Sequence, residues 1–257
     1  MCIYGGFKMI QSVERAFSII EILSDDPLPQ PLSTISAKSE LAPATTHRFL
    51  DTLCQLGYVK NDSNGRYSLT LKLFNIAGGA IKQNSLVSIA QGYLTQLSEK
   101  VHETVHLMLR DGNEVVYVFK SVQVIGAIQM ASHIGTRFPM YCTAGGKAIL
   151  STLPASEVLS VFNSSNVRRL TEKTITSPEE LLRQMDVVRK NGYALDHEEN
   201  EDGIICIGMP LGIDPTSVRY AFSVSSLATR FTPDRIAEVV VEMRRTKQLI
   251  ENELANI

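Results

Sequence analysis

Residues 31–67 of the chain read PLSTISAKSELAPATTHRFLDTLCQLGYVKNDSNGRY, and this stretch decides the fold. Apolar residues recur in it at helical spacing in two runs, which a break at residues 39–43 separates. Pro43 suits the first turn of the second helix, and Gly57 tolerates the positive φ at which a helix often ends. We therefore expect two short helices that meet at a turn, with the second helix running from Pro43 to about Leu56.

The outer face of this second helix is typical of a helix that reads DNA. Short or hydrogen-bonding side chains gather near its N-terminus, the end that a recognition helix points at base edges. The candidate DNA-contacting residues on this helix are Pro43, Ala44, Thr45, His47 and Arg48. Among them, Thr45, His47 and Arg48 are the expected readers of the bases.

A β-hairpin is expected directly after the two helices. Its strands flank a polar loop that ends in Asn64-Gly65, a dipeptide that favours tight hairpin turns. Lys60 and Arg66 stand at the basic ends of the hairpin and can meet phosphates. The whole unit is thus predicted to be a winged helix-turn-helix. Two amphipathic helices and a hairpin can also form an ordinary small domain, but the order and tight spacing of the elements favour DNA binding.

Five short runs of sequence resemble the DNA-binding half of the IclR family of transcriptional regulators. They are QSVERA (residues 11–16), TTHRFL (45–50), LGYV (56–59), YSL (67–69) and LKL (71–73). The resemblance covers nearly the whole chain from Ser12 and implies a sequence-specific DNA-binding regulator of transcription. One departure concerns Pro43-Ala44, where the family usually carries Lys-Ser or a similar polar pair. We therefore expect an operator that differs from the family's better-known sites.

Composition describes a globular protein rather than a membrane or disulfide-rich one. The 257 residues include 44% hydrophobic and 20% charged residues, with no apolar run of transmembrane length and no signal sequence, so we expect a cytoplasmic protein without a membrane partner. The four cysteines are far apart and form no Cys-x-x-Cys pair, which disfavours disulfides and thiolate metal sites. The net charge of −2 argues mildly against a nucleic-acid partner. The acids near the N-terminus, however, lie mostly on the first helix and its loop, away from the proposed DNA face.

The pattern of elements divides the chain near residue 80. An apolar helix is expected over about residues 13–23, and another over 71–81 with a break near Gly78-Gly79. A connector helix follows from Ser85 to about Val101. Further strands are expected at residues 104–110, 114–120, 126–130, 193–195, 204–211 and 219–225, and further helices at 144–152, after Pro154, after Ser177 and from Pro233 to about Leu254.

These elements predict an α+β protein of two domains. Residues 1–80 form the winged helix-turn-helix domain, and residues 81–257, which include the connector helix, form an effector-binding domain with a mostly antiparallel sheet. The resemblance implies that this second domain is GAF-like and binds a small-molecule effector.

One motif suggests a zinc site. Residues His102-Glu103-Thr104-Val105-His106 match the His-Glu-x-x-His signature of zinc hydrolases. That chemistry requires both imidazoles on one face of a helix. Here a hairpin turn follows soon after His106, so the motif is expected to straddle a helix end and a strand, where the two imidazoles cannot share one zinc ion. A zinc-dependent hydrolase is the alternative function, and we expect no metal, no cofactor and no enzymatic activity, because motifs for nucleophilic or cofactor chemistry are also missing.

Three further segments resemble the effector-binding domain of the same family, namely residues 134–148, 196–207 and 221–225. The resemblance places the following residues around the effector: Met130, Ala144, Gly145, Asp196, Cys206, Ser223 and Ser225. The backbone at Ala144-Gly145, before a helix, offers a seat for a carboxylate, and Ser223 and Ser225 face the same side of a strand. Cys206 can equally be core filler, and Asp196 can simply cap a turn.

The expected effector is a compact hydroxylated or keto acid. Its carboxylate would bind at Ala144-Gly145, while Asp196 would accept hydrogen bonds from its hydroxyls. A two-fold dimer would match a palindromic operator on double-stranded DNA, with the first helix and the connector as candidate dimer surfaces. The resemblance extends the expected assembly from a homodimer to a homotetramer.

Overall fold

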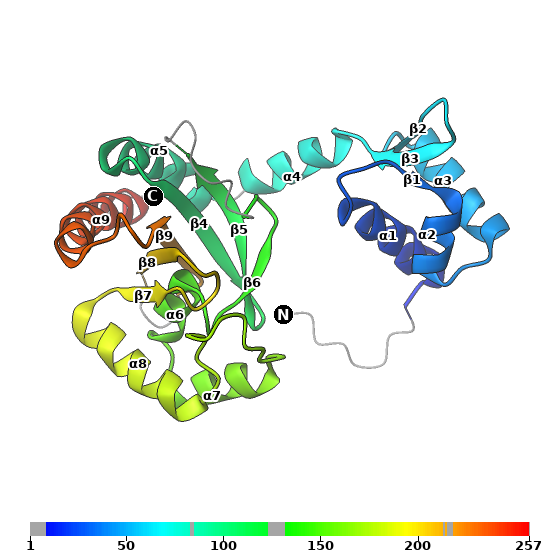
Figure 1. The fold of residues 1–257 in the computed structure, drawn as a ribbon. Coiled ribbons are helices and arrows are strands. Elements are labelled where there is room, and N and C mark those ends of the chain that lie inside the picture. Colours follow the sequence, from blue (N-terminus) through cyan, green and yellow to red (C-terminus); the bar gives the residue numbers. More distant parts are fainter. Residues whose placement is uncertain (1–8, 83–84, 123–131, 213, 215–217, 257) are drawn as a thin grey trace. The chain divides into compact units, whose positions relative to one another are not determined.

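The computed structural model describes residues 9–82, 85–122, 132–212, 214 and 218–256. The chain divides into two compact units, Met1–Ala80 and Ile81–Ile257 (Figure 1). Within the described ranges, no helix combines the length and the apolar character needed to cross a membrane.

The first unit is a winged helix-turn-helix, as the sequence predicts. Its elements are α1 (Gln11–Ser24), β1 (Gln30–Pro31), α2 (Leu32–Ser39), α3 (Pro43–Gln55), β2 (Val59–Asn61) and β3 (Arg66–Leu69). Pro43 occupies the first turn of α3, and Gly57 follows that helix with a φ of 78°. The local signals for the two ends of α3 were therefore correct.

A small core of aliphatic side chains holds the three helices against the hairpin. Ile19 of α1, Ile35 of α2 and Leu50 of α3 are fully buried in it. The hairpin of β2 and β3 gains a third strand, β1, which pairs antiparallel with β3. Strand β1 was not predicted from the sequence, because it has two residues and pairs with a segment more than thirty positions away.

The predicted connector helix is α5 (Ser85–Val101), and α4 (Lys72–Lys82) precedes it in the chain. The predicted break at Gly78-Gly79 is wrong, because α4 continues through both glycines. Glycine inside a helix costs about 1 kcal/mol relative to alanine, which weakens a helix without ending it. Neither glycine has the positive φ that would terminate α4.

The second unit contains a six-stranded antiparallel sheet in the order β6-β5-β4-β9-β8-β7. Its strands are β4 (Thr104–Asp111), β5 (Glu114–Ser121), β6 (Arg137–Pro139), β7 (Ala194–His197), β8 (Ile204–Leu211) and β9 (Tyr220–Leu227). The prediction of a mostly antiparallel α+β domain is thus confirmed. The strand expected at residues 126–130 lies outside the described residues, and β6 was not predicted.

Helices cover both faces of this sheet (Figure 1). On one face, α5 and α9 (Pro233–Leu254) pack against apolar residues of the central strands, such as Leu107, Ile207 and Phe222. On the other face lie α6 (Ala144–Leu150), α7 (Ala155–Ser164) and α8 (Pro178–Asn191). Because side chains alternate along each strand, the residues between the α5–α9 contacts face α6, and they can line a pocket there.

Candidate functional site

The N-terminal half of α3 presents a polar surface. Pro43, Ala44, His47 and Arg48 are exposed and Thr45 is half-buried, whereas Thr46 faces the core. His47 Nδ1 lies 3.0 Å from Asp51 Oδ2, one helical turn further on, so this contact orients the imidazole. All five predicted helix residues are therefore accessible to a partner in this unit.

The hairpin of β2 and β3 is the wing of this unit, and its two basic residues differ in their surroundings. Lys60 is exposed on β2. Arg66 is also exposed, but its Nη1 donates a hydrogen bond of 3.5 Å to the carbonyl oxygen of Pro29. This bond leaves the other guanidinium nitrogens of Arg66 available for an anion.

The structure adds Arg15 to the predicted DNA face. Arg15 of α1 lines a hollow together with residues of α3, among them Thr45, Arg48 and Thr52. Arg15 was not among the DNA-contacting residues predicted from the sequence, where the first helix was noted only for its apolar residues. The signal that could have revealed Arg15 is its position on the polar side of that amphipathic helix.

The His-Glu-x-x-His motif does not lie on one helix. His102 follows the end of α5 with a φ of 55°, whereas His106 is buried on β4. Glu103 is buried and paired with Arg230, whose Nη2 lies 2.8 Å from Glu103 Oε1. The geometry needed for two imidazoles one helical turn apart is therefore missing, and the described residues contain no cluster of three or more metal-ligating side chains.

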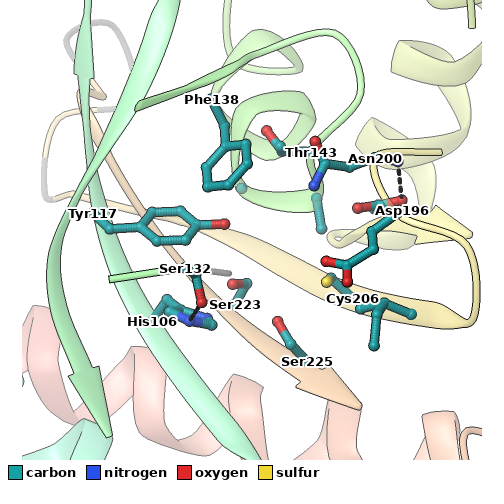
Figure 2. Close-up of a pocket in the computed structure, with 14 residues that line it drawn as sticks. His106, Tyr117, Ser132, Phe138, Thr143, Asp196, Asn200, Cys206, Ser223 and Ser225 are labelled. Carbon is teal, nitrogen blue, oxygen red and sulfur yellow. Dashed lines mark hydrogen bonds between the residues drawn. The ribbon is translucent and has the colours of Figure 1, made fainter. Parts of the chain in front are cut away.

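A pocket lies in the second unit between the sheet and the start of α6 (Figure 2). Its cavity volume is about 30 Å³, which favours a compact occupant. Six of the seven predicted effector residues line it: Ala144, Gly145, Asp196, Cys206, Ser223 and Ser225. The seventh, Met130, lies outside the described residues.

Strand register explains why distant residues meet here. Asp196 of β7 is paired with Cys206 of β8, and Cys206 is paired with Ser225 of β9. Ser223 is paired in turn with His106 of β4. Residues paired across adjacent strands point to the same face of a sheet. This register therefore places the five side chains of Asp196, Cys206, Ser225, Ser223 and His106 around one cavity.

The pocket has an aromatic side that the sequence analysis missed. The ring of Tyr117 stacks on His106 at a centroid distance of 4.7 Å and lies 5.2 Å from the ring of Phe138. His106 Nε2 lies 2.9 Å from Ser132 Oγ, and burial lowers the pKa of His106 to about 3, so this imidazole is neutral. Figure 2 shows the Tyr117 hydroxyl directed toward the middle of the pocket.

The edge of the pocket is shared with a hollow on the protein surface. Phe138, Asn200 and Glu201 line both spaces. These three residues therefore lie where the pocket and the surface hollow adjoin.

Asp196 both caps a turn and faces the pocket. Its Oδ1 accepts hydrogen bonds from the backbone N–H groups of Glu199 at 2.8 Å and Asn200 at 3.3 Å. The side chain is almost completely buried, and burial, reinforced by the nearby Glu199, raises the pKa of Asp196 to about 7. The turn cap expected from the sequence is therefore present, and the same side chain also lines the pocket.

A buried ion pair lies next to Asp196. Lys147 of α6 is completely buried and pairs with Glu199 Oε1, while Glu199 Oε2 has no hydrogen-bond partner within the described part of the chain. Thr174 Oγ1 donates to the carbonyl oxygen of Glu199 at 2.7 Å and fixes this turn from outside. Lys147, whose positive charge acts on Asp196, is therefore already paired with another carboxylate.

The glycines at the start of α6 have a packing role. A Cβ atom at Gly145 would lie 1.8 Å from Met108 Sδ, and one at Gly146 would lie 2.4 Å from Met140 Cα. Thr143 caps the helix, and its Oγ1 accepts a hydrogen bond from the Gly146 N–H at 3.3 Å. Close packing thus accounts for the Ala-Gly-Gly sequence independently of any anion bound there.

Comparisons with known proteins agree with this architecture. Residues 12–63 match the family described as IclR helix-turn-helix domain, and residues 78–252 match Bacterial transcriptional regulator IclR C-terminal. The HTH-type transcriptional regulator KdgR of Escherichia coli (strain K12) is 33% identical over 246 residues, which cover 95% of this chain and 93% of KdgR.

Two solved structures share the fold. The Thermotoga maritima IclR has a TM-score of 0.80 at 30% identity, covering 96% of this chain and 99% of that one. An IclR homologue from Microbacterium hydrocarbonoxydans, complexed with 4-hydroxybenzoate, has a TM-score of 0.83 at 20% identity, covering 96% and 100% of the two chains.

Proposed function

The chain belongs to the IclR family of bacterial transcriptional regulators, and we propose that it binds a specific operator through α3 and the wing under the control of a compact organic acid. One observation carries the proposal of DNA binding. The N-terminal half of α3 exposes one face, while the opposite face of the helix packs onto the core of the helix-turn-helix unit. In helix-turn-helix proteins this end of the second helix contacts base edges in the major groove.

Within this face, we assign two kinds of contact. Thr45, His47 and Arg48 contact bases, because they can donate or accept hydrogen bonds from the N-terminal part of α3. Lys60 and Arg66 on the wing contact phosphates, which fix the position of the protein on the duplex without reading its sequence.

The operator is palindromic on this proposal, because the protein binds as a homodimer or a pair of homodimers. Apolar side chains remain exposed on α1 and α4, where Val13 is 50%, Phe17 59% and Phe74 70% exposed. Exposed apolar side chains grouped on one helix mark surfaces that another chain covers. Light scattering should therefore find a dimer or tetramer, and a monomer both with and without DNA would contradict this assembly.

The pocket of the second unit is the proposed effector site. Ser223 and Ser225 offer hydroxyls, the backbone at Ala144-Gly145 offers a seat for the carboxylate, and the small volume suits a compact hydroxylated or keto acid. The complex of the Microbacterium homologue with 4-hydroxybenzoate is consistent with a small organic acid as the class of ligand.

DNA binding is tested by a mobility-shift assay on the DNA that flanks the protein's own gene. Wild-type protein should bind one fragment specifically, with an affinity that falls as salt rises. Arg48→Ala should weaken this binding roughly 10- to 100-fold, the usual worth of a good base contact. Arg183→Ala, which removes an exposed arginine of α8, is the control and should bind like wild type. Equal affinities of the two variants would refute the assignment of α3.

The effector site is tested by a thermal-shift screen of pyruvate, glycerate and 4-hydroxybenzoate at pH 6. A bound acid should raise the melting temperature of the wild type by mass action. The double variant Ser223→Ala/Ser225→Ala should lose most of this shift and still bind DNA. Ser226 follows Ser225 on β9 but does not line the pocket. The control variant Ser226→Ala should therefore keep the full thermal shift. A full shift in the double variant would show that the ligand binds elsewhere.

A further inference from the structure

Among the described residues, the pocket lining contains carboxyl groups and no lysine or arginine to balance them. The carboxyl groups are those of Asp196 and Glu201. Asp196 is only 3% exposed, so water screens its charge poorly. An acid that binds here places a second negative charge beside Asp196.

The groups that face Asp196 from the neighbouring elements do not neutralise it. Lys147 on α6 is already paired with Glu199, and Glu199 itself adds negative charge at the turn after β7. Cys206 on β8, Cys142 before α6 and Tyr117 on β5 all have pKa values raised by burial, so they stay neutral at ordinary pH. His106 on β4 is neutral as well, because burial lowers its pKa.

Within the described part of the chain, both hydrogen bonds that Asp196 accepts go to the same carboxyl oxygen. Oδ1 accepts both backbone hydrogen bonds of the turn, and Figure 2 shows the carboxyl group facing the pocket across from the Tyr117 hydroxyl. A proton on Oδ2 leaves the two backbone bonds intact. It also converts the side chain from an acceptor into a donor directed at the ligand.

We infer that Asp196 binds the effector as the neutral acid, donating a hydrogen bond from Oδ2 to an oxygen of the anion, so that each anion bound at neutral or alkaline pH takes up one proton from solvent. This inference rests on the proposed function, because it requires an acid in this pocket. It makes Asp196 a specificity determinant for ligands that present an oxygen acceptor. The sequence analysis expected the opposite direction, with Asp196 as the acceptor.

The proton balance gives a quantitative expectation. Free protein carries a charged Asp196 above pH 7 and a neutral one below it, because its pKa is about 7. The complex holds the proton throughout. The dissociation constant should therefore be constant below pH 7 and rise roughly tenfold for each pH unit well above it.

The test uses the full-length protein and the acid with the largest thermal shift among pyruvate, glycerate and 4-hydroxybenzoate. Isothermal titration calorimetry at pH 8.5, in two buffers with different ionisation enthalpies, should show an uptake close to one proton for each acid bound. The uncharged amide of the same acid serves as the control ligand. Its NH₂ group can donate a hydrogen bond to the charged Asp196, so its affinity should not weaken tenfold per unit as the pH rises.

Asp196→Asn is the informative variant. Asparagine keeps an oxygen for the two backbone bonds and presents an N–H donor in place of protonated Oδ2. At pH 8.5 it should bind the acid at least tenfold more tightly than wild type, with no proton uptake and no change of affinity between pH 6 and pH 9. Glu201→Gln is the matched control, because it removes the other lining carboxylate and should retain the pH dependence of the wild type.

The two proposals fail in different ways. If an acid binds the wild type with an affinity independent of pH and without proton uptake, the neutral-acid role of Asp196 is overturned while the effector site stands. If none of the three acids binds at pH 6, where Asp196 is protonated, the proposed acid effector fails and this inference fails with it. Calorimetry on the wild type tests the neutral-acid role of Asp196 even if the Asp196→Asn variant does not fold.

Discussion

The hydroxyl of Ser36 donates a hydrogen bond of 2.9 Å to the hydroxyl of Thr46, inside the junction of α2 and α3. Both side chains are buried, and Thr46 also bonds the carbonyl oxygen of Ala42 before α3. This short network joins the two helices of the DNA-binding unit. It therefore sets the position of the helix that presents Thr45, His47 and Arg48.

Thr46→Val should destabilise the first unit by about 1–3 kcal/mol, because it keeps the shape of the side chain and leaves the Ser36 hydroxyl buried without its partner. The double variant Ser36→Ala/Thr46→Val should recover part of this loss. Thr52→Val, which removes an exposed hydroxyl from the same helix, should change the free energy of unfolding little. Urea unfolding followed by circular dichroism measures all three, and similar losses for Thr46→Val and Thr52→Val would contradict the role of the buried pair.

The first unit could be predicted closely from sequence because its signals are local. Pro43 and Gly57 mark the two ends of α3 by their own backbone preferences, and Gly65 has the positive φ that its hairpin turn requires. The break expected at Gly78-Gly79 was wrong because glycine only lowers the stability of a helix.

Several residues that line the pocket could not be predicted from local sequence patterns. Ser223 and Ser225 share a face by simple alternation along a strand, which the sequence reveals. Tyr117 and His106 reach the same cavity only through the register of β4 with β5 and β9. The burial of Asp196, which sets its pKa, likewise depends on how α6 packs over the sheet.

Lys147→Met should destabilise the second unit by about 3–5 kcal/mol. The buried Glu199 carboxylate would lose its salt-bridge partner, and an unpaired buried charge is costly. The double variant Lys147→Met/Glu199→Gln should recover much of the loss. Lys173→Met, which breaks the more exposed pair with Glu198, should have little effect on the urea midpoint. Equal effects of the two lysine substitutions would refute a special role for the buried pair.

Gly208→Ala should disturb both stability and the pocket. A Cβ atom at Gly208 of β8 would lie 2.4 Å from the carbonyl carbon of Ala144, so the start of α6 would have to move away from the sheet. We expect a loss of about 1–3 kcal/mol and weaker acid binding. Gly78→Ala in α4, where a Cβ meets nothing within 4 Å, should instead stabilise its helix. Thermal unfolding with and without acid compares the two, and a Gly208→Ala protein as stable as wild type would contradict the close contact.

Asp196→Asn should also change how stability depends on pH without any ligand. The pKa of an aspartate is about 3.9 in the unfolded chain, and that of Asp196 is raised to about 7 by burial. Between these values the folded protein holds a proton that the unfolded chain has released. Asp196 therefore makes the wild type progressively less stable as the pH rises from about 4 to 7, and the loss is complete above that range. Its full size is on the order of 4 kcal/mol.

The wild-type curve alone does not isolate this effect, because His106 acts in the opposite direction. Its pKa is lowered to about 3, so the unfolded chain binds a proton below pH 6.5 that the folded protein excludes, and His106 makes the protein more stable as the pH rises through that range. The contribution of His106 is common to both proteins and cancels in the difference between Asp196→Asn and wild type. Urea unfolding at pH 5, 6, 7 and 8 should therefore show the relative stability of Asp196→Asn increasing at each step. Parallel curves for the two proteins would mean that Asp196 does not titrate near neutral pH, and the proton uptake expected on acid binding would lose its physical basis.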